Sequence, residues 1–329
     1  MSFVTLLTAL VGFVLLALTI RQVGWSSVVS GIASLGWMFV IVIALGALRA
    51  AMRARAWMVC VQAANANAQR RAGESPRLSF IDAFNALLAA DAIGNVTPLG
   101  LLASEPAKVM MVRSRLSTVT SIATVAIENA CYTVSVLFVL LTGTWLFSQR
   151  ANLPQSLERA AEVVVVSAIA AALGTLWAAR NRPAILSRFG PVIAILGGRA
   201  HAPADRLREV ETKIYDAAHW PLSRLAHIGV WEALFHVFAV AEVWLVLRVV
   251  PGGAQTTLVD AFLMESAGRF VTVAFKFIPF RLGVDEAGSG LVAQVVGIPA
   301  VTGVTLALVR RLRIFVLNAA GLLILARRR

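Results

Sequence analysis

Ionisable side chains inside long apolar runs are the residues of this chain best placed to do chemistry. Glu128 lies in the middle of the run Ser117–Phe147, and Arg310 lies in the last run, Val301–Ala326. A charge in apolar surroundings is costly unless it is paired or bound to a ligand. Glu128 and Arg310 are therefore the first candidates for a site.

Two further acids precede these charges at nearly equal spacing. Glu105 lies 23 positions before Glu128, and Glu286 lies 24 positions before Arg310. The similar spacing predicts an ion pair between Glu128 and Arg310. Such a pair either locks two helices together or presents the Arg310 guanidinium to a phosphate group through forked hydrogen bonds.

Basic residues accompany the same acids. Glu105 and Glu286 either cap helix N-termini, where a carboxylate is favoured, or belong to sites that attract an anion. Lys108, together with Arg113 and Arg115, either serves such a site or extends to the membrane surface. The basic candidates around Glu286 are Arg269, Lys276 and Arg281.

Glu232 and His236 lie four positions apart and share one face of a helix. We expect them to form a hydrogen-bonded core pair, and proton relay is the alternative. The sequence contains no Cys/His cluster, phosphate loop or nucleophile elbow, so we expect no metal, no cofactor and no enzymatic activity.

Membrane-spanning helices must position these side chains. Hydrophobic residues make up 59% of the 329 residues and charged residues only 14%, which excludes an ordinary soluble domain. A span needs roughly 20 apolar residues. Six runs meet this requirement: Phe3–Ile20, Ser34–Ala51, Ser117–Phe147, Ala160–Ala179, Leu225–Val250 and Val301–Ala326.

The net charge of +13 is best explained by orientation in a membrane and not by nucleic-acid binding. With six crossings, the basic stretches 49–77, 180–224 and 327–329 all fall on one side, which predicts an inner-membrane protein with both termini in the cytoplasm. This requires the irregular stretches 80–112 and 258–297 to return to their own side. We therefore expect two hairpins, either re-entrant or made of paired spans.

The two irregular stretches also resemble each other. Both contain the order Asp-Ala-Phe, Pro and Glu, with Asp82, Pro98 and Glu105 in the first and Asp260, Pro279 and Glu286 in the second. We expect the two Asp residues to be helix N-caps or first-turn acids. Three crossings per half invert the second half, which predicts an all-α inverted repeat. The halves are 1–150 and 151–329, and the second includes an amphipathic cytoplasmic segment, 184–220.

The segment from Pro279 to Glu286 resembles the Pro-x-x-x-Gly-Val-x-Glu signature of a flippase-like family. That family is named for the transmembrane region of lysylphosphatidylglycerol synthases. Asn95-Val96-Thr97-Pro98 with Glu105 resembles its first-hairpin signature, and Arg310 lies where members carry an arginine in the last helix. Some relatives are associated with hopanoid biosynthesis. The chain ends soon after its last helix, so we expect it to lack the soluble aminoacyl-transferase domain.

The resemblance implies translocation or scrambling of a phospholipid or isoprenoid lipid, with the membrane lipid as ligand. Two alternatives remain open at this point. One is a proton- or ion-coupled transporter of a small solute. The other is a non-transporting scaffold that partners a lipid-modifying enzyme.

Overall fold

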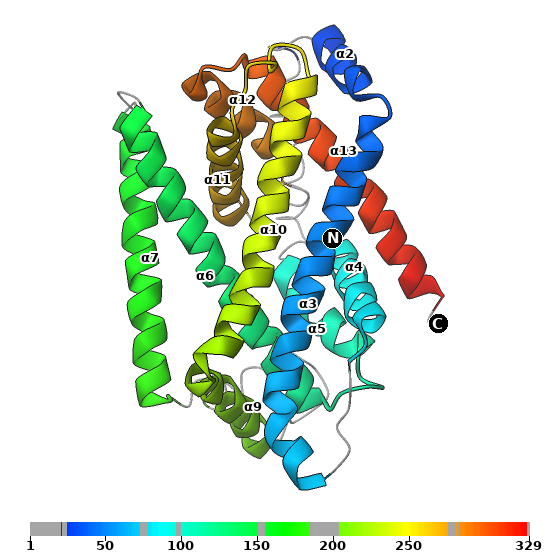
Figure 1. The fold of residues 1–329 in the computed structure, drawn as a ribbon, viewed down its shortest axis with the longest axis vertical. Helices are drawn as coiled ribbons and strands as arrows, with labels where there is room; N and C mark the ends of the chain where they lie inside the picture. Colours follow the sequence, from blue (N-terminus) through cyan, green and yellow to red (C-terminus); the bar gives the residue numbers. More distant parts are fainter. Residues whose placement is uncertain are drawn as a thin grey trace.

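The computed structural model describes residues 25–72, 78–96, 100–150, 155–183, 204–275 and 283–327, together with Arg21, Arg188 and Arg281. Every regular element in these ranges is a helix, as expected for an all-α chain (Figure 1). The helices are α2 (Trp25–Leu35), α3 (Met38–Ala72), α4 (Phe80–Val96), α5 (Gly100–Met111), α6 (Thr118–Arg150), α7 (Gln155–Asn181), α9 (Ala204–Asp216), η1 (Ala217–His219), α10 (Leu222–Val249), α11 (Leu258–Ala274), α12 (Val284–Val296) and α13 (Ala300–Ala326).

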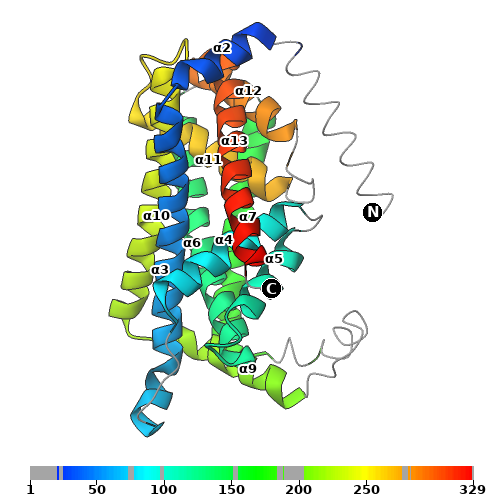
Figure 2. The ribbon, with the colours of Figure 1, turned by 90° about the vertical axis from the view of Figure 1, so that its right-hand side faces the viewer.

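Long helices form the frame of the molecule. α3 and α10 run side by side along its long axis and form its most extensive helix contact (Figures 1 and 2). Their shared core contains Val42 of α3 and Val243 and Val246 of α10, all without exposed surface. α3 is longer than the apolar run that predicted it, because the helix continues past Ala51 through Ala72.

Two of the described helices are long and apolar enough to cross a membrane, at Thr118–Gln149 and Leu222–Val249. A third candidate is the pair Val29–Leu35 and Met38–Asn65, which are bent by 79° at their junction. α13 is also 27 residues long, but Arg310, Arg311 and Arg313 interrupt its apolar character. These helices agree with an α-helical membrane protein, and the count of six spans stays a prediction.

The two irregular stretches each form a pair of packed helices, α4 with α5 and α11 with α12. The end of α4 and the start of α5 approach each other closely: a Cβ atom on Gly100 would lie 2.3 Å from the Gly94 carbonyl oxygen. α12 begins after Gly283, whose φ of 75° favours glycine. Glycine thus allows the close approach at Gly100 and the backbone conformation at Gly283.

Both Asp residues of the repeated motif are first-turn acids, so this part of the prediction is confirmed. Asp260 forms a capping box with Thr257, the N-cap of α11. The Asp82 carboxylate accepts a hydrogen bond from the Ser79 hydroxyl, and the Asp82 backbone N–H donates to the Ser79 hydroxyl oxygen. The two helix pairs therefore start in the same way.

α13 packs against both helix pairs. Near its start, a Cβ on Gly303 would lie 2.3 Å from the Ser289 carbonyl oxygen of α12. Near its end, a Cβ on Gly321 would lie 2.3 Å from the Leu88 carbonyl oxygen of α4. The three arginines of α13 lie between these two contacts, so α13 carries them into the region where both pairs meet.

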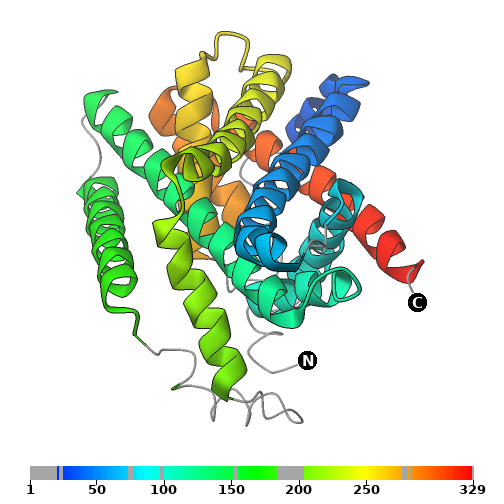
Figure 3. The same cartoon turned by 60° about the horizontal axis from the view of Figure 1, so that its bottom comes forward.

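The polar segment before α10 forms the amphipathic helix α9, which crosses one end of the molecule and packs on α6 (Figures 1 and 3). Val210 is buried against the bundle, whereas Arg208 and Glu209 are exposed. This confirms an amphipathic helix within the stretch 184–220, and residues 184–187 and 189–203 lie outside the described ranges. The division into halves at residue 150 stays a prediction.

Candidate functional site

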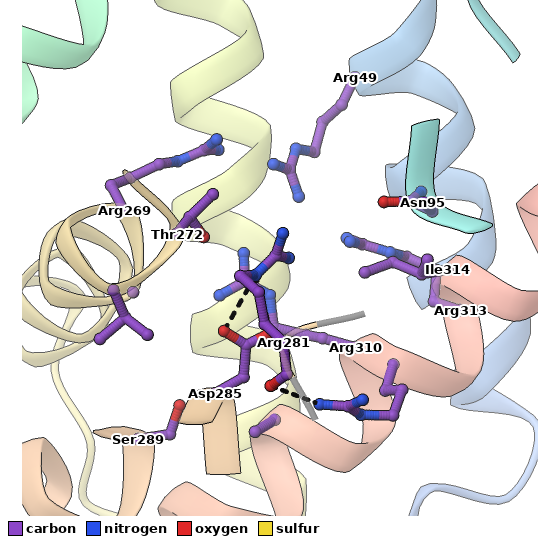
Figure 4. A pocket seen from close by; sticks show the side chains of 14 residues that line it. Arg49, Asn95, Arg269, Thr272, Arg281, Asp285, Ser289, Arg310, Arg313 and Ile314 are labelled. Carbon is purple, nitrogen blue, oxygen red and sulfur yellow. Dashed lines mark hydrogen bonds and ion pairs between the residues drawn. The ribbon is translucent and has the colours of Figure 1, made fainter. Parts of the chain in front are cut away.

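A cavity of about 150 Å³ lies where α3, α11, α12 and α13 approach one another (Figure 4). Six arginines line it. Asn95, at the end of α4, also reaches this cavity, and its side-chain amide donates to the Asn318 side-chain oxygen of α13 at 3.1 Å. The arginines are Arg49, Arg269, Arg281, Arg310, Arg311 and Arg313.

Two buried acids hold most of these guanidinium groups in place. Glu242 of α10, fully buried, accepts hydrogen bonds from Arg49 at 3.0 Å and from Arg313, and its other oxygen lies 3.6 Å from Arg310. Glu265 of α11, 1% exposed, accepts from Arg269 and from Arg310, each at 2.7 Å. One carboxylate thus serves several arginines.

The remaining two arginines pair with acids of α12. Arg311 donates to the fully buried Glu286 at 2.6 Å. Arg281, whose φ of 49° lies in the left-handed region, donates to Asp285 at 3.2 Å. The Arg311 guanidinium also donates to the Arg281 carbonyl oxygen at 3.3 Å, which ties the start of α12 to α13.

The charges of this group do not balance. Six arginines face four acids, Glu242, Glu265, Asp285 and Glu286, so these ten side chains carry a net charge of 6 − 4 = +2. In addition, the Nε atoms of Arg49 and Arg313 are buried without a hydrogen-bond partner in the described part of the chain. Buried donors in surplus positive charge favour an anion as the missing partner.

The predicted ion pair between Glu128 and Arg310 is wrong. Arg53 of α3 donates to both carboxylate oxygens of Glu128, at 2.8 and 2.9 Å. The cause is helix packing: α6 packs against α3, whose Arg53 takes Glu128 as its partner, whereas α13 packs mainly against α12 and α4. Arg310 therefore finds its acids on α10 and α11.

Glu128 belongs to a second polar cluster, beside the α4–α5 pair. Arg53 also donates to the Asn129 side-chain oxygen at 3.2 Å, and Asn129 donates to Glu105 at 2.8 Å. Lys108 donates to the other oxygen of Glu105 at 3.0 Å and is 2% exposed. Glu105 lies in the second turn of α5, so it does not cap that helix, and Lys108 does not extend to the surface.

Arg113 and Arg115 remain exposed, as expected for residues near a membrane surface. They line a second, larger hollow of about 570 Å³ between the α4–α5 pair and the end of α13. Arg115 forms an ion pair with Asp82 at 3.3 Å. Met110 and Leu325 contribute apolar walls to this hollow.

The predicted pair of Glu232 and His236 does not form. The Nε2 atom of His236 lies 3.0 Å from the Ser135 hydroxyl oxygen, and neither Glu232 oxygen has a hydrogen-bond partner among the described residues. Within the same residues, no group of three or more His, Cys, Asp or Glu side chains is placed to hold a metal ion.

The structure thus brings Arg269, Arg281, Glu286 and Arg310 together and places Glu105, Lys108 and Glu128 in the other cluster. Lys276 lies outside the described residues, as do Pro98 and Pro279. Arg311 and Arg313, like Arg310, are cations that orientation in the membrane does not explain, and for that reason the sequence already pointed to them. Sequence reasoning missed Arg49, Arg53, Glu242 and Glu265 as site residues. Acids inside an apolar run were the available signal for Glu242 and Glu265.

The family model described as the lysylphosphatidylglycerol synthase TM region matches residues 5–321 of the chain. No curated protein matches the chain, and no solved structure does.

Proposed function

Since the chain belongs to the family of the lysylphosphatidylglycerol synthase transmembrane region, we propose that it is a flippase-like transporter of membrane lipids. The transported lipid carries a phosphate in its headgroup. The protein moves or scrambles this lipid without modifying it covalently. Family membership supports a lipid-related membrane role, and the arginine cavity supports the choice of an anionic headgroup.

The observation that carries the proposal is the surplus of two positive charges around the cavity. Guanidinium groups match phosphate oxygens in pairs, because their N–H donors form a planar fork. Arg49 and Arg313 both line the cavity, so a phosphate that enters it would accept hydrogen bonds from their guanidinium groups. The same phosphate compensates the net charge.

The architecture supports this proposal. We place six spans and two re-entrant hairpins in an inverted repeat, with both termini in the cytoplasm of a bacterial-type inner membrane. α5 and α12 have 12 and 13 residues, fewer than the roughly 20 that a span needs, which favours re-entrant hairpins over paired spans. Such backbone is tolerated at membrane depth where protein or a wet cavity surrounds it.

The two hollows give the headgroup a place near each helix pair. The arginine cavity lies beside α11 and α12, and the larger hollow with Arg113 and Arg115 lies beside α4 and α5. The acyl chains remain in the bilayer, against apolar side chains on the outer surface such as Phe138 and Val166, which are 71% and 65% exposed.

Reconstitution into liposomes tests the proposal. Fluorescent phosphatidylglycerol and a fluorescent uncharged lipid are placed in both leaflets, and outer-leaflet fluorescence is then bleached with a membrane-impermeant reductant. We expect the protein to expose additional anionic probe to the reductant. Movement no faster than in protein-free liposomes for every lipid tested would refute the proposal, and a small-solute transporter or a scaffold for a lipid-modifying enzyme would replace it.

A matched pair of variants ties the activity to the cavity. Arg49→Gln removes a lining charge, and we expect the apparent affinity for the anionic lipid to fall about tenfold or more, since hydrogen bonds to charged groups contribute about 1.5–3 kcal/mol. Arg208→Gln makes the same change on the exposed face of α9 and should transport like the unaltered protein.

A further inference from the structure

Glu232, on α10, is an acid that the arginine cavity does not use. It is 1% exposed, and neither of its carboxyl oxygens has a hydrogen-bond partner in the described ranges. An ionised carboxylate in such a position is strongly disfavoured, whereas a carboxyl group that holds a proton is neutral. Its burial therefore favours a bound proton over a charge.

The surroundings of Glu232 are apolar on one side. Ile228, one turn earlier on α10, belongs to a buried cluster with Cys60 of α3 and Ile127 of α6, against which Cys131 and Trp231 pack. No described element supplies this carboxyl group with a hydrogen bond.

Charged and titratable groups reach it from the neighbouring helices. α3 contributes Arg53 and Cys60, α6 contributes Glu128 and Cys131, and α11 contributes Arg269. Next to these groups, Tyr132 of α6 bonds Arg269, and Glu265 of α11 acts on His236 of α10. Arg49 acts on His236, and Asp91 of α4 acts on Arg53. On α13, Arg310 and Arg313 face Glu242 and Glu265, and Arg311 faces Glu286, while α2 has no titratable side chain.

Tyr132 connects both ion clusters next to this acid. Its hydroxyl oxygen accepts a hydrogen bond from Arg269 at 2.8 Å, while the Arg53 guanidinium lies 4.3 Å from its ring centre. The His236 ring stacks on the Tyr132 ring, with ring centroids 6.2 Å apart. A displacement of Arg53 or Arg269 therefore changes the contacts of Tyr132, which stacks on His236.

We propose that Glu232 is a proton-binding site that couples proton movement to the lipid movement proposed above, on which the coupling part of this inference rests. In the described state, Glu128 occupies Arg53 through two hydrogen bonds, and Glu232 keeps its proton. When Arg53 leaves Glu128, the Glu232 carboxylate becomes its partner. The proton is then released to water, so that one O–H bond breaks for each Arg53 transfer.

Proton binding is measured without any lipid substrate. Infrared spectra of the purified protein near neutral pH should contain the carbonyl band of a protonated carboxylic acid, which shifts in heavy water and is absent from Glu232→Gln. Glu209→Gln, an exposed acid on α9, should leave the band unchanged. Identical spectra for the unaltered protein and Glu232→Gln would overturn the site. If Glu232→Gln does not fold, Glu232→Asp should move the band, and an unmoved band overturns the site.

Coupling is measured in the same liposomes with a pH difference across the bilayer. With one proton per lipid, each pH unit shifts the leaflet distribution of the anionic probe by up to about tenfold. Glu232→Gln should still move the probe but lose this shift, whereas Glu209→Gln should keep it. A shift that survives in Glu232→Gln, or no shift in the unaltered protein, overturns the coupling. If no lipid moves at all, the transport proposal fails while the infrared result still decides the proton site.

Discussion

Replacing Glu242 with glutamine tests whether the buried arginines are held by shared carboxylates. Glu242 serves Arg49 and Arg313 directly and lies 3.6 Å from Arg310. Glu242→Gln keeps the shape of the side chain but raises the net charge of the ten-residue group from +2 to +3. Removing one partner of a buried ion pair costs about 3–5 kcal/mol, because the remaining charge is left uncompensated.

A double-mutant cycle separates the stability that the Glu242–Arg313 ion pair contributes from the cost of a general packing defect. Arg313→Gln alone also breaks the pair, but the double variant Glu242→Gln with Arg313→Gln restores the charge difference of +2. We expect the double variant to be more stable than the sum of the single effects predicts, by about 1–3 kcal/mol.

The free energy of unfolding is measured by titration with sodium dodecyl sulfate in mixed micelles. Glu209→Gln on the exposed face of α9 serves as the control, and it should change the free energy by less than about 0.5 kcal/mol. An anionic lipid headgroup should stabilise Glu242→Gln more than the unaltered protein, since it replaces the lost negative charge. Additive effects in the cycle would refute the shared-carboxylate explanation.

Three further predictions concern other parts of the fold. Gly100→Ala should destabilise the packing of α5 on α4 by about 1–3 kcal/mol, because its Cβ would lie 2.3 Å from the Gly94 carbonyl oxygen. Gly174→Ala, in open space on α7, should be neutral or stabilising in the same unfolding titration. Thr257→Ala should cost about 1 kcal/mol by removing the α11 capping box, and Thr257→Ser should recover most of that stability. Arg53→Gln should remove the two hydrogen bonds that the Glu128 carboxylate accepts from Arg53, and it should lower the thermal unfolding temperature. A decrease no larger than that of Arg208→Gln would contradict a structural role for the Arg53–Glu128 pair.

The helical class, the paired helices and the first-turn acids were predictable from the sequence because they depend on local patterns. Asp82 and Asp260 each begin an apolar segment three residues after a hydroxyl side chain, and this arrangement caps a helix whatever lies around it. The family resemblance rested on the same kind of short pattern and was confirmed by the match over residues 5–321. Local order along the chain was therefore sufficient for these features.

The partners of the charges were not predictable, because tertiary packing decides them. Arg49 and Arg53 belong to a basic stretch that we assigned to the cytoplasmic side, yet the helix continues beyond them and carries both into the bundle. Nearly equal spacing suggested that Glu128 and Arg310 meet, but Glu128 pairs with Arg53 of α3 and Arg310 pairs with Glu265 of α11. The hydropathy of a helix shows how many charges it carries, but not which neighbouring helix supplies the counter-charge.

The three arginines of α13 link the stability of the fold to the transport that we propose. Successive helical residues point about 100° apart, so Arg310, Arg311 and Arg313 face different neighbours. Arg310 reaches Glu265 of α11, Arg311 reaches Glu286 of α12, and Arg313 reaches Glu242 of α10. α13 is thus fastened to three helices by one carboxylate each.

A movement of α13 past any of these helices leaves a buried arginine without its carboxylate, which is strongly unfavourable. In the transport that we propose, a lipid phosphate would remove this obstacle, because it is an anion that matches the same guanidinium fork. An empty carrier would then be held in one state, and a loaded carrier would be free to exchange partners. It follows that variants of these arginines should lose stability and the proposed transport together. The two roles are separated by comparing transport between samples that contain the same amount of folded protein.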